Sequence, residues 1–230
     1  MRVLLARLRL PLFSVRHHET YQVASALPFL PPSTIIGALT QAAARGGLCA
    51  GDCLAEVRGW IAKARDTAAP TAKFPVMLRR ARGVLEEGGL PPSAEELASY
   101  FDAMVREYAY TAERAVLVVP SAESHLGRLE KALWLLERVG DTESYASVAE
   151  VAEIDARPCG VGEVNIAVKL NNAVGGAYLV VKAGDEDSAL ADFAVPLAAS
   201  GRGYYTPTKI AVKGDVLCAE DIAFPAGHDW

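Results

Sequence analysis

Side chains that could take part in acid–base chemistry gather in one short segment near the start of the chain. His17 and His18 directly follow Arg16, and Tyr21 lies three residues further on. Imidazole, phenol and guanidinium groups can act as general base, general acid and anion partner when they share a site. An ordinary polar loop has the same composition, so both interpretations stay open for this segment.

The chain lacks the sequence motifs of several common enzyme classes. Catalytic-triad signatures, HExxH and GxSxG are absent from the sequence. Two Gly-x-Gly pairs, at 160–162 and 201–203, lack the third glycine and the following helix of a dinucleotide-binding loop. The sequence therefore predicts no catalytic residue and no cofactor.

Four cysteines bear on metal binding and on the redox compartment: Cys49, Cys53, Cys159 and Cys218. The first two, separated by three residues, make only half of a zinc site, and no CxxC or HxxxH motif supplies the other half. Arginines interrupt the apolar N-terminal stretch, so it does not resemble a secretory signal. We therefore predict reduced cysteines, no metal and a cytoplasmic protein.

Positive charge is concentrated in the first part of the chain. Residues 1–82 hold 12 Lys and Arg against 4 Asp and Glu, whereas residues 83–230 hold 11 against 24, within a net charge of −5. A basic part of this kind can bind a polyanion. Acidic residues that only solvate the remaining surface would produce the same asymmetry, and the charge pattern does not choose between the two.

Hydrophobic periodicity indicates the elements that must position these residues. Strands are predicted at 3–13, 74–78, 115–119 and 145–154, and helices at 33–45, 52–65, 91–107 and 125–139. Ser33 or Thr34 stands where an N-cap is expected, at a helix end that can bind an anion. Val3, Leu5, Arg7 and Arg9 share one face of the first strand, which is predicted to be exposed or to meet an anion.

The order of these elements predicts an α+β protein. Residues 1–155 read as the βαββαβ arrangement of a ferredoxin-like (RRM-like) domain, with helices inserted around 46–115. Short strand-like runs at 163–170, 177–183, 189–195 and 208–218 predict a small antiparallel region over 156–230. No apolar run approaches the ~18 residues of a membrane span, so no membrane contact is predicted.

Two segments resemble a known family. The first runs from Phe13-Ser14-Val15-Arg16 through Tyr21 to Leu27-Pro28-Phe29-Leu30-Pro31-Pro32-Ser33-Thr34-Ile35-Ile36-Gly37-Ala38-Leu39. The second, Arg138-Val139-Gly140-Asp141-Thr142-Glu143-Ser144-Tyr145-Ala146-Ser147-Val148, is similar to a Gly-x-x-Glu-Ser turn into the last strand of a ferredoxin-like unit. Both resemble the CRISPR-associated family-five proteins, the Cascade subunits that hold the 5′ handle of the guide RNA (crRNA). Asp141 and Thr142 stand where family members often carry basic residues.

The resemblance implies a non-catalytic RNA-binding and assembly subunit of a type I Cascade complex in antiviral defence, with archaeal subtype I-A the nearest match. The implied partners are the crRNA 5′ handle, the backbone subunit, the large subunit and, through the complex, target DNA. A thumb within the 46–115 insertion would contact the backbone subunit. The RNA-binding residues predicted on this basis are Arg7, Arg9, Arg16, His17, His18, Tyr21, Ser33, Thr34, Lys73, Arg79, Arg80 and Arg82.

A second function stays open beside RNA binding. One subtype of the family cleaves precursor RNA without metal, which requires a base and an acid around a 2′-hydroxyl and a cation for the phosphate. His17 or His18, together with Tyr21 and Lys73, could supply these groups. An interaction domain with no RNA role is the third alternative.

Overall fold

A four-stranded antiparallel sheet lies at the centre of the protein. It consists of β1 (Arg2–Arg9), β2 (Ile61–Asp66), β5 (Arg114–Pro120) and β6 (Ser147–Asp155), in the order β2-β5-β1-β6. All three strand pairs are antiparallel. The computed structural model describes residues 1–18, 24–227 and 230.

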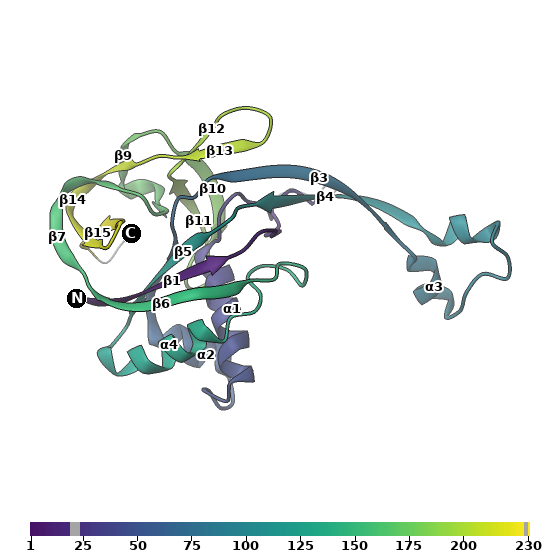
Figure 1. Cartoon of the computed structure of the whole chain (residues 1–230), viewed down its shortest axis with the longest axis horizontal. Helices are drawn as coiled ribbons and strands as arrows, with labels where there is room; N and C mark the ends of the chain where they lie inside the picture. Colours follow the sequence, from purple (N-terminus) through teal and green to yellow (C-terminus); the bar gives the residue numbers. More distant parts are fainter. Residues whose placement is uncertain (19–23, 228–229) are drawn as a thin grey trace.

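Both faces of this sheet are covered. Leu4 and Leu8 of β1 belong to one hydrophobic cluster with α1 (Pro32–Arg45), α2 (Cys53–Trp60) and α4 (Leu126–Trp134). Val3 and Leu5 point the other way and pack among C-terminal strands in a second cluster. Figure 1 shows the helices on one side of the sheet and the C-terminal strands on the other. Of the two alternatives predicted for this face, exposure is wrong for Val3 and Leu5, because the C-terminal strands cover these apolar side chains.

The C-terminal strands form three small sheets, and the prediction of an α+β protein with antiparallel strands in this region is confirmed. The first contains β7 (Arg157–Val164), β14 (Ile210–Ala219) and β15 (Ile222–Pro225), with β9 (Ala173–Gly176) beside β14. The second contains β8 (Val168–Lys169), β10 (Leu179–Gly184) and β11 (Leu190–Val195). In the third, β12 (Leu197–Ala199) and β13 (Tyr204–Pro207) join β3 (Thr71–Arg80) and β4 (Asp102–Tyr110) of the earlier part of the chain.

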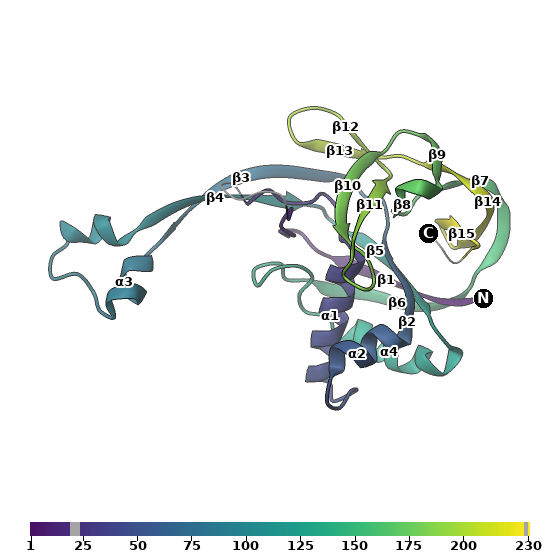
Figure 2. The same ribbon diagram turned by 180° about the vertical axis from the view of Figure 1, so that it is seen from behind.

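Strands β3 (Thr71–Arg80) and β4 (Asp102–Tyr110) form a long hairpin, which we call the arm. Its tip contains α3 (Arg82–Glu87) and the 3-10 turn η1 (Glu96–Tyr100). Figures 1 and 2 show the arm reaching far beyond the rest of the molecule. Among the described residues, none between 72 and 107 is a buried hydrophobic of the core.

The predicted helix over 91–107 is wrong. Its Pro-Pro-Ser-Ala-Glu-Glu start leads only to η1, and the remaining residues pair with β3 as β4, from Asp102 opposite Arg80 to Tyr110 opposite Ala72. Most helical stability in proteins comes from packing the apolar face of the helix against other elements. The arm provides no core against which a helix over 91–107 could pack such a face. Pairing with β3 satisfies the backbone instead.

Three further helix predictions need correction at their ends. The helix predicted over 52–65 stops at Trp60, because Ile61 starts β2 in the central sheet. The helix predicted over 125–139 is the 3-10 turn η2 (Glu123–His125) followed by α4, which ends at Trp134. Pro31, not Ser33 or Thr34, is the N-cap of α1, and no side chain caps that end. A last short turn, η3, spans Leu170–Asn172, and no helix of the described residues is long and apolar enough to cross a membrane.

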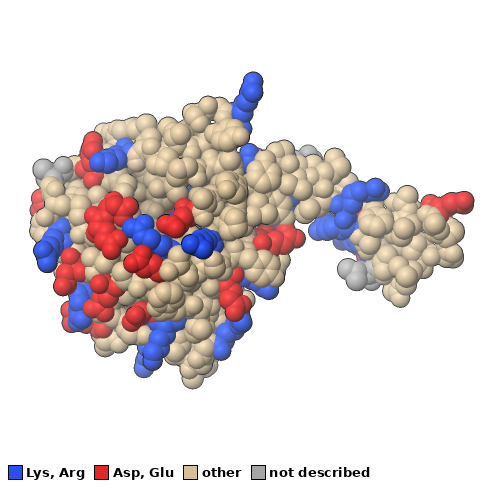
Figure 3. Space-filling model, in the orientation of Figure 1, with Lys and Arg blue, Asp and Glu red and all other residues tan. Residues whose placement is uncertain are grey.

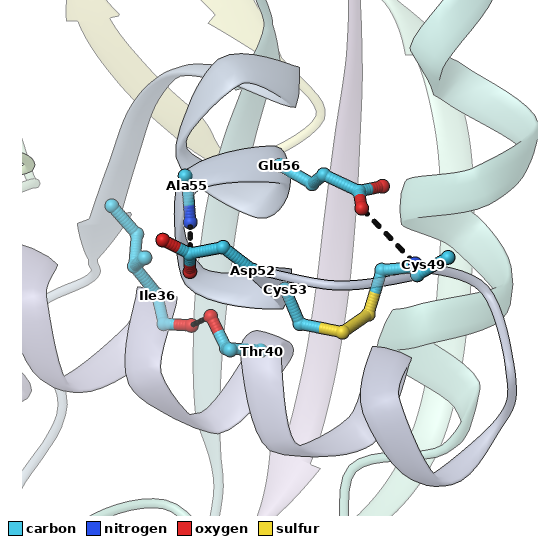
Figure 4. The surroundings of a disulfide bond; sticks show 8 residues. Ile36, Thr40, Cys49, Asp52, Cys53, Ala55 and Glu56 are labelled. Atoms are coloured by element: carbon cyan, nitrogen blue, oxygen red, sulfur yellow. Dashed lines mark hydrogen bonds between the residues drawn. A yellow bond between two sulfur atoms is a disulfide. The ribbon is translucent and has the colours of Figure 1, made fainter.

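The prediction of reduced cysteines is wrong, since all four form disulfides within the chain. Cys49 and Cys53 join the loop after α1 to the start of α2, with their Cα atoms 5.3 Å apart. Cys159 of β7 and Cys218 of β14 link neighbouring strands, with Cα atoms 5.7 Å apart. Figure 4 shows the first bridge beside the N-cap Asp52, which accepts a hydrogen bond from the Ala55 N–H at 3.1 Å. The fold brings the two cysteines of each pair within bridging distance. Cys49 and Cys53, considered above as half of a zinc site, are therefore joined in a disulfide and have no free thiol.

Candidate nucleic-acid interface

A pocket of about 270 Å³ opens where four segments of the chain meet. The loop after β1, one face of α1, strand β4 and the turn after α4 each supply part of its lining. The residues that carry the argument below are Ser14, Arg16, Thr34, Gly37, Arg106, Arg138, Gly140 and Asp141. The two segments that carry the family resemblance, far apart in the sequence, therefore contribute to one pocket.

Helix α1 presents its first turns to this pocket. Pro31 is extended and Pro32 opens the helix, so two prolines fix the direction in which the helix leaves the preceding loop. Thr34 and Gly37 lie three residues apart on one helix face and both line the pocket. A Cβ built on Gly37 would meet nothing within 4 Å. The positive end of the helix dipole favours an anion here, and glycine leaves room for a ligand to approach.

The turn after α4 is held in shape by its own polar groups. The Ser144 hydroxyl donates to Asp141 Oδ1 at 2.7 Å, and the Glu143 N–H donates to the same atom at 3.2 Å. The Ser144 Oγ also accepts the Ser14 N–H at 3.0 Å. Gly140 has φ of 118°, and a Cβ on it would lie 3.1 Å from both Ser14 O and Ser144 Oγ. The Gly-x-x-Glu-Ser motif therefore docks this turn onto the loop after β1.

Two arginines that the sequence prediction did not include point to the same pocket. Arg106 of β4 pairs with Asp141, and its guanidinium lies 5.5 Å from the centre of the Tyr108 ring. Arg138 donates to the Tyr145 hydroxyl at 3.1 Å and lies 4.8 Å from the centre of that ring. The buried Nε of Arg138 has no hydrogen-bond partner within the part of the chain that is described. With Arg16, the lining holds three arginines against one aspartate and is net positive.

Arg16, Thr34 and Ser33 are the predicted site residues at or beside this pocket. Arg16 and Thr34 line it directly. Ser33 faces the C-terminal region instead, because a Cβ added to Gly184 would lie 2.6 Å from the Ser33 Oγ. The RNA contacts of all three stay predictions.

Two of the other predicted cations, Arg7 and Lys73, already have acidic partners. Arg7 lies 3.0 Å from Glu220 and 2.9 Å from Asp221, and hydrogen bonds to these carboxylates raise its pKa. The Lys73 Nζ lies 2.9 Å from the Glu107 carboxylate, and the Lys73 side chain is only 13 % exposed. Arg9 is exposed at the end of β1, with no ion pair to any described residue. The phosphate contacts predicted for Arg7 and Lys73 would therefore have to compete with internal ion pairs.

Three predicted arginines lie on the arm rather than at the pocket. Arg79 packs its guanidinium 5.4 Å from the centre of the Phe101 ring. Arg80 pairs with Asp102 at 3.1 Å, and Arg82 pairs with Glu86 at 2.6 Å. Figure 3 shows Lys and Arg side chains clustered on the arm just before its tip. Strand pairing and helical spacing therefore bring acids of the more negative part of the chain beside Arg80 and Arg82.

The predicted acid–base group is only partly described. The His17 and His18 rings stack on each other, with centroids 5.3 Å apart and planes 9° from parallel. Tyr21 lies outside the described residues. In the ranges 1–18, 24–227 and 230, no three His, Cys, Asp or Glu side chains are grouped so that they could hold a metal ion.

Comparison with known proteins identifies the family. A family model described as CRISPR-associated protein (Cas_Cas5) matches residues 3–214. The chain is 41 % identical over its whole length to all of a CRISPR-associated protein Cas5 of Thermoproteus tenax. It is 27 % identical to a Cas5 of Methanocaldococcus jannaschii, over 68 % of this chain and 66 % of that one. The crystal structure of a CRISPR protein from Archaeoglobus fulgidus shares the fold, with a TM-score of 0.61, 13 % identity and 97 % coverage of both chains. The chain belongs to the CRISPR-associated Cas5 family.

Proposed function

We propose that this protein is a non-catalytic RNA-binding subunit of a type I Cascade complex, where it holds the 5′ handle of the crRNA. The observation that carries the proposal is the net-positive pocket at which the Pro-Pro-Ser-Thr helix start meets the Gly-x-x-Glu-Ser turn. We further propose that residues 1–155 are a ferredoxin-like unit, which the β2-β5-β1-β6 order and the helices on one face support. An archaeal subtype I-A source fits the archaeal relatives.

The pocket has the groups that single-stranded RNA requires. Arginines bind phosphate oxygens in a bidentate way, and unpaired bases stack on aromatic rings or on guanidinium planes. Arg16, Arg106 and Arg138 supply the cations, and Tyr145 supplies a ring that is 59 % exposed. Asp141 holds Arg106 in place. In this proposal the handle backbone crosses the pocket beside Gly37, and a base stacks near Tyr145.

The arm is the proposed thumb. Met77 and Leu90 are 69 % and 80 % exposed, so their apolar surface is open to contact with another subunit. We propose that they and the neighbouring arginines contact the backbone subunit of the complex. The large subunit, and target DNA through the complex, remain the other proposed partners in antiviral defence. No membrane contact is proposed.

The alternative, a metal-independent endoribonuclease, would need His17 or His18, Tyr21 and Lys73 around one 2′-hydroxyl. The Lys73–Glu107 ion pair favours the non-catalytic proposal, since the lysine charge is already compensated and largely buried. Incubation of the protein with precursor repeat RNA, with and without magnesium, is expected to give no site-specific cut. A single defined cut that disappears in His17→Ala or His18→Ala, with affinity intact, would establish the nuclease instead.

The proposal can be tested on the native assembly. The protein is purified with its natural neighbours, ultraviolet light crosslinks any bound RNA, and the RNA and the crosslinked peptides are sequenced. We expect repeat-derived 5′ ends attached to peptides that contain Thr34 or Arg138. Unrelated cellular RNA, or crosslinks confined to other subunits, would contradict the proposed role.

A further inference from the structure

A second pocket, of about 350 Å³, lies at the base of the arm and is lined mainly by aromatic and small side chains. Ala72 of β3, Tyr110 of β4 and Tyr204 of β13 belong to it, together with the hydroxyl-bearing Ser200 and Thr206. Tyr110 and Tyr204 are 49 % and 60 % exposed. None of its lining residues is acidic or basic, so it differs in chemistry from the arginine-lined pocket beside α1.

The pairing register of β13, β3 and β4 places Tyr204, Ala72 and Tyr110 side by side across three neighbouring strands. Tyr204 is directly opposite Ala72, and Ala72 is directly opposite Tyr110. Residues paired in this way project from the same face of a sheet, so two tyrosines flank one alanine. Neighbouring strands are ~4.8 Å apart, which places the two tyrosine backbones roughly 9.6 Å apart. A planar ring inserted between two aromatic rings needs stacked centroid separations of about 4.5 Å or more on each side, so one ring fits above Ala72.

A glycine holds Tyr204 in this register. Gly203 has φ of 80°, and a Cβ on it would lie 2.4 Å from the Lys73 carbonyl oxygen. Its own carbonyl accepts the Lys73 N–H at 2.7 Å. Only glycine allows β13 to approach β3 this closely without strain. The tyrosine that follows is thereby fixed opposite Ala72.

We propose that the Tyr110–Ala72–Tyr204 row, which we call the aromatic slot, binds an unpaired base of single-stranded nucleic acid. Arg202, at the turn before Tyr204, forms no ion pair with any described residue and can meet a phosphate beside the stacked base. Tyr110 is four residues from Arg106 on β4, about 14 Å along the same strand face, so one strand of nucleic acid can reach both sites. The slot goes beyond the proposed handle binding, because stacking needs a base but no particular sequence.

The test uses the full chain and an oligoadenosine of about 12 nucleotides. A strand of equal length without bases has the same charge, and the deoxy form distinguishes RNA from DNA as the source of the base. Tyr110→Leu with Tyr204→Leu is expected to weaken binding of the base-containing strand about tenfold or more and to leave the abasic strand unaffected. The matched variant, Tyr110→Phe with Tyr204→Phe, keeps both rings and is expected to bind as the unaltered protein does. Thermal unfolding of each variant shows that the fold is kept.

Equal affinity of the leucine variant and the unaltered protein for oligoadenosine would overturn the slot, and so would equal losses for the strands with and without bases. Unchanged nucleic-acid binding with a lost subunit contact would assign the tyrosines to protein docking and also overturn it. Failure of handle recognition gives a different result. In that case the repeat-derived tag binds no better than unrelated RNA, while the base-dependent loss in the leucine variant persists.

Discussion

Arg138 is the residue on which RNA binding at the arginine-lined pocket depends most directly. It lines the pocket, and its buried Nε has no hydrogen-bond partner among the described residues. We expect Arg138→Gln to weaken binding of the repeat-derived RNA tag about tenfold, because one charge-assisted contact is lost. The slope of log K against log salt should become shallower by ~0.7, the contribution of one phosphate contact on a single strand. Affinity titrations at several salt concentrations measure both quantities.

Lys131→Gln is the matched control for this variant. It removes one positive charge from an exposed position of α4 that does not line the pocket. Its RNA affinity and salt slope should remain those of the unaltered protein. Equal losses in the two variants would mean that RNA binding depends on net charge and not on this pocket.

Glu107 makes stability depend on pH. Burial raises its pKa, but hydrogen bonds from Ser25 and Lys73 outweigh burial and hold the pKa below its ordinary value of 4.5. The folded protein therefore binds fewer protons than the unfolded chain in this window, so stability rises with pH up to about 4.5 and is lost as pH falls through the folded pKa. We expect Glu107→Gln to lower the free energy of unfolding by about 1–3 kcal/mol at pH 7 and by much less near pH 3.5. Urea unfolding at both pH values tests this.

Glu130→Gln serves as the comparison, because Glu130 is exposed on α4 and forms no ion pair with any described residue. It should not change the acid profile. A Glu107→Gln protein with the same pH dependence as the unaltered protein would contradict the assigned role.

At the residue scale, the sequence identified some contributors to the site and missed others for a clear reason. Arg16 and Thr34 were found because they belong to a recognisable local segment. Arg106 was missed because its partner Asp141 and its aromatic neighbour Tyr108 become its environment only after β4 has paired and the turn has docked. Lys73 was selected for its charge, although the fold places Glu107 beside it.

The core is expected to fold without the tip of the arm. Replacing residues 81–101 with Asn-Gly would join Arg80 and Asp102, which already face each other in the hairpin. Because none of the removed residues whose burial is described belongs to the core, the free energy of unfolding should change by less than about 1 kcal/mol. We expect the shortened protein to bind the RNA tag but to lose association with the backbone subunit. Thermal unfolding and co-purification with that subunit measure the two effects.

An unfolded shortened protein would contradict the separation of arm and core. Full association with the backbone subunit would contradict the role of the arm as thumb. The full-length variant Glu95→Gln, altered within the arm tip at an exposed position, controls for small local changes.

At the level of helices and strands, hydrophobic periodicity predicted the elements that pack against the core and gave a wrong prediction for the arm, which does not. The alternation in β1 and the apolar stripes of α1 and α4 were readable because both elements bury a face in one core. The arm has no such face, so its proline and acidic residues suggested a helix where strand pairing dominates. The end of α2 was missed because Ile61 and Ala64 fit a helical stripe as well as a buried strand.

Across the whole molecule, the basic first part of the chain does not form one continuous basic surface, because many of its cations have acidic partners. Basic residues of the first part pair with acids of the second: Arg7 with Glu220 and Asp221, Arg45 with Glu137, Arg65 with Glu186, Lys73 with Glu107, and Arg80 with Asp102. Much of the positive charge of residues 1–82 is therefore compensated within the fold. The arginine-lined pocket keeps its excess of positive charge, which is why it and not the whole basic part is the candidate interface.

The two disulfides should contribute unequally to stability. The Cys159–Cys218 bridge spans 59 residues, whereas the Cys49–Cys53 bridge spans 4. Loop-closure entropy predicts losses of about 4 kcal/mol and about 2 kcal/mol when each pair is replaced by serine. The first loss corresponds to a melting temperature roughly 8–16 °C lower. Chemical unfolding of the two serine variants and of the unaltered protein measures both losses, and equal losses in the two variants would contradict the prediction.

The most direct test of the account is the affinity of the isolated protein for a short RNA that carries the 5′ repeat-derived tag, compared with unrelated RNA of equal length. Handle binding at the arginine-lined pocket predicts tighter binding of the tag, a log K that falls by ~0.7 per phosphate contact as log salt rises, and about tenfold weaker binding of the tag in Arg138→Gln. Equal affinity for both RNAs, with no change in Arg138→Gln, would contradict the proposed function.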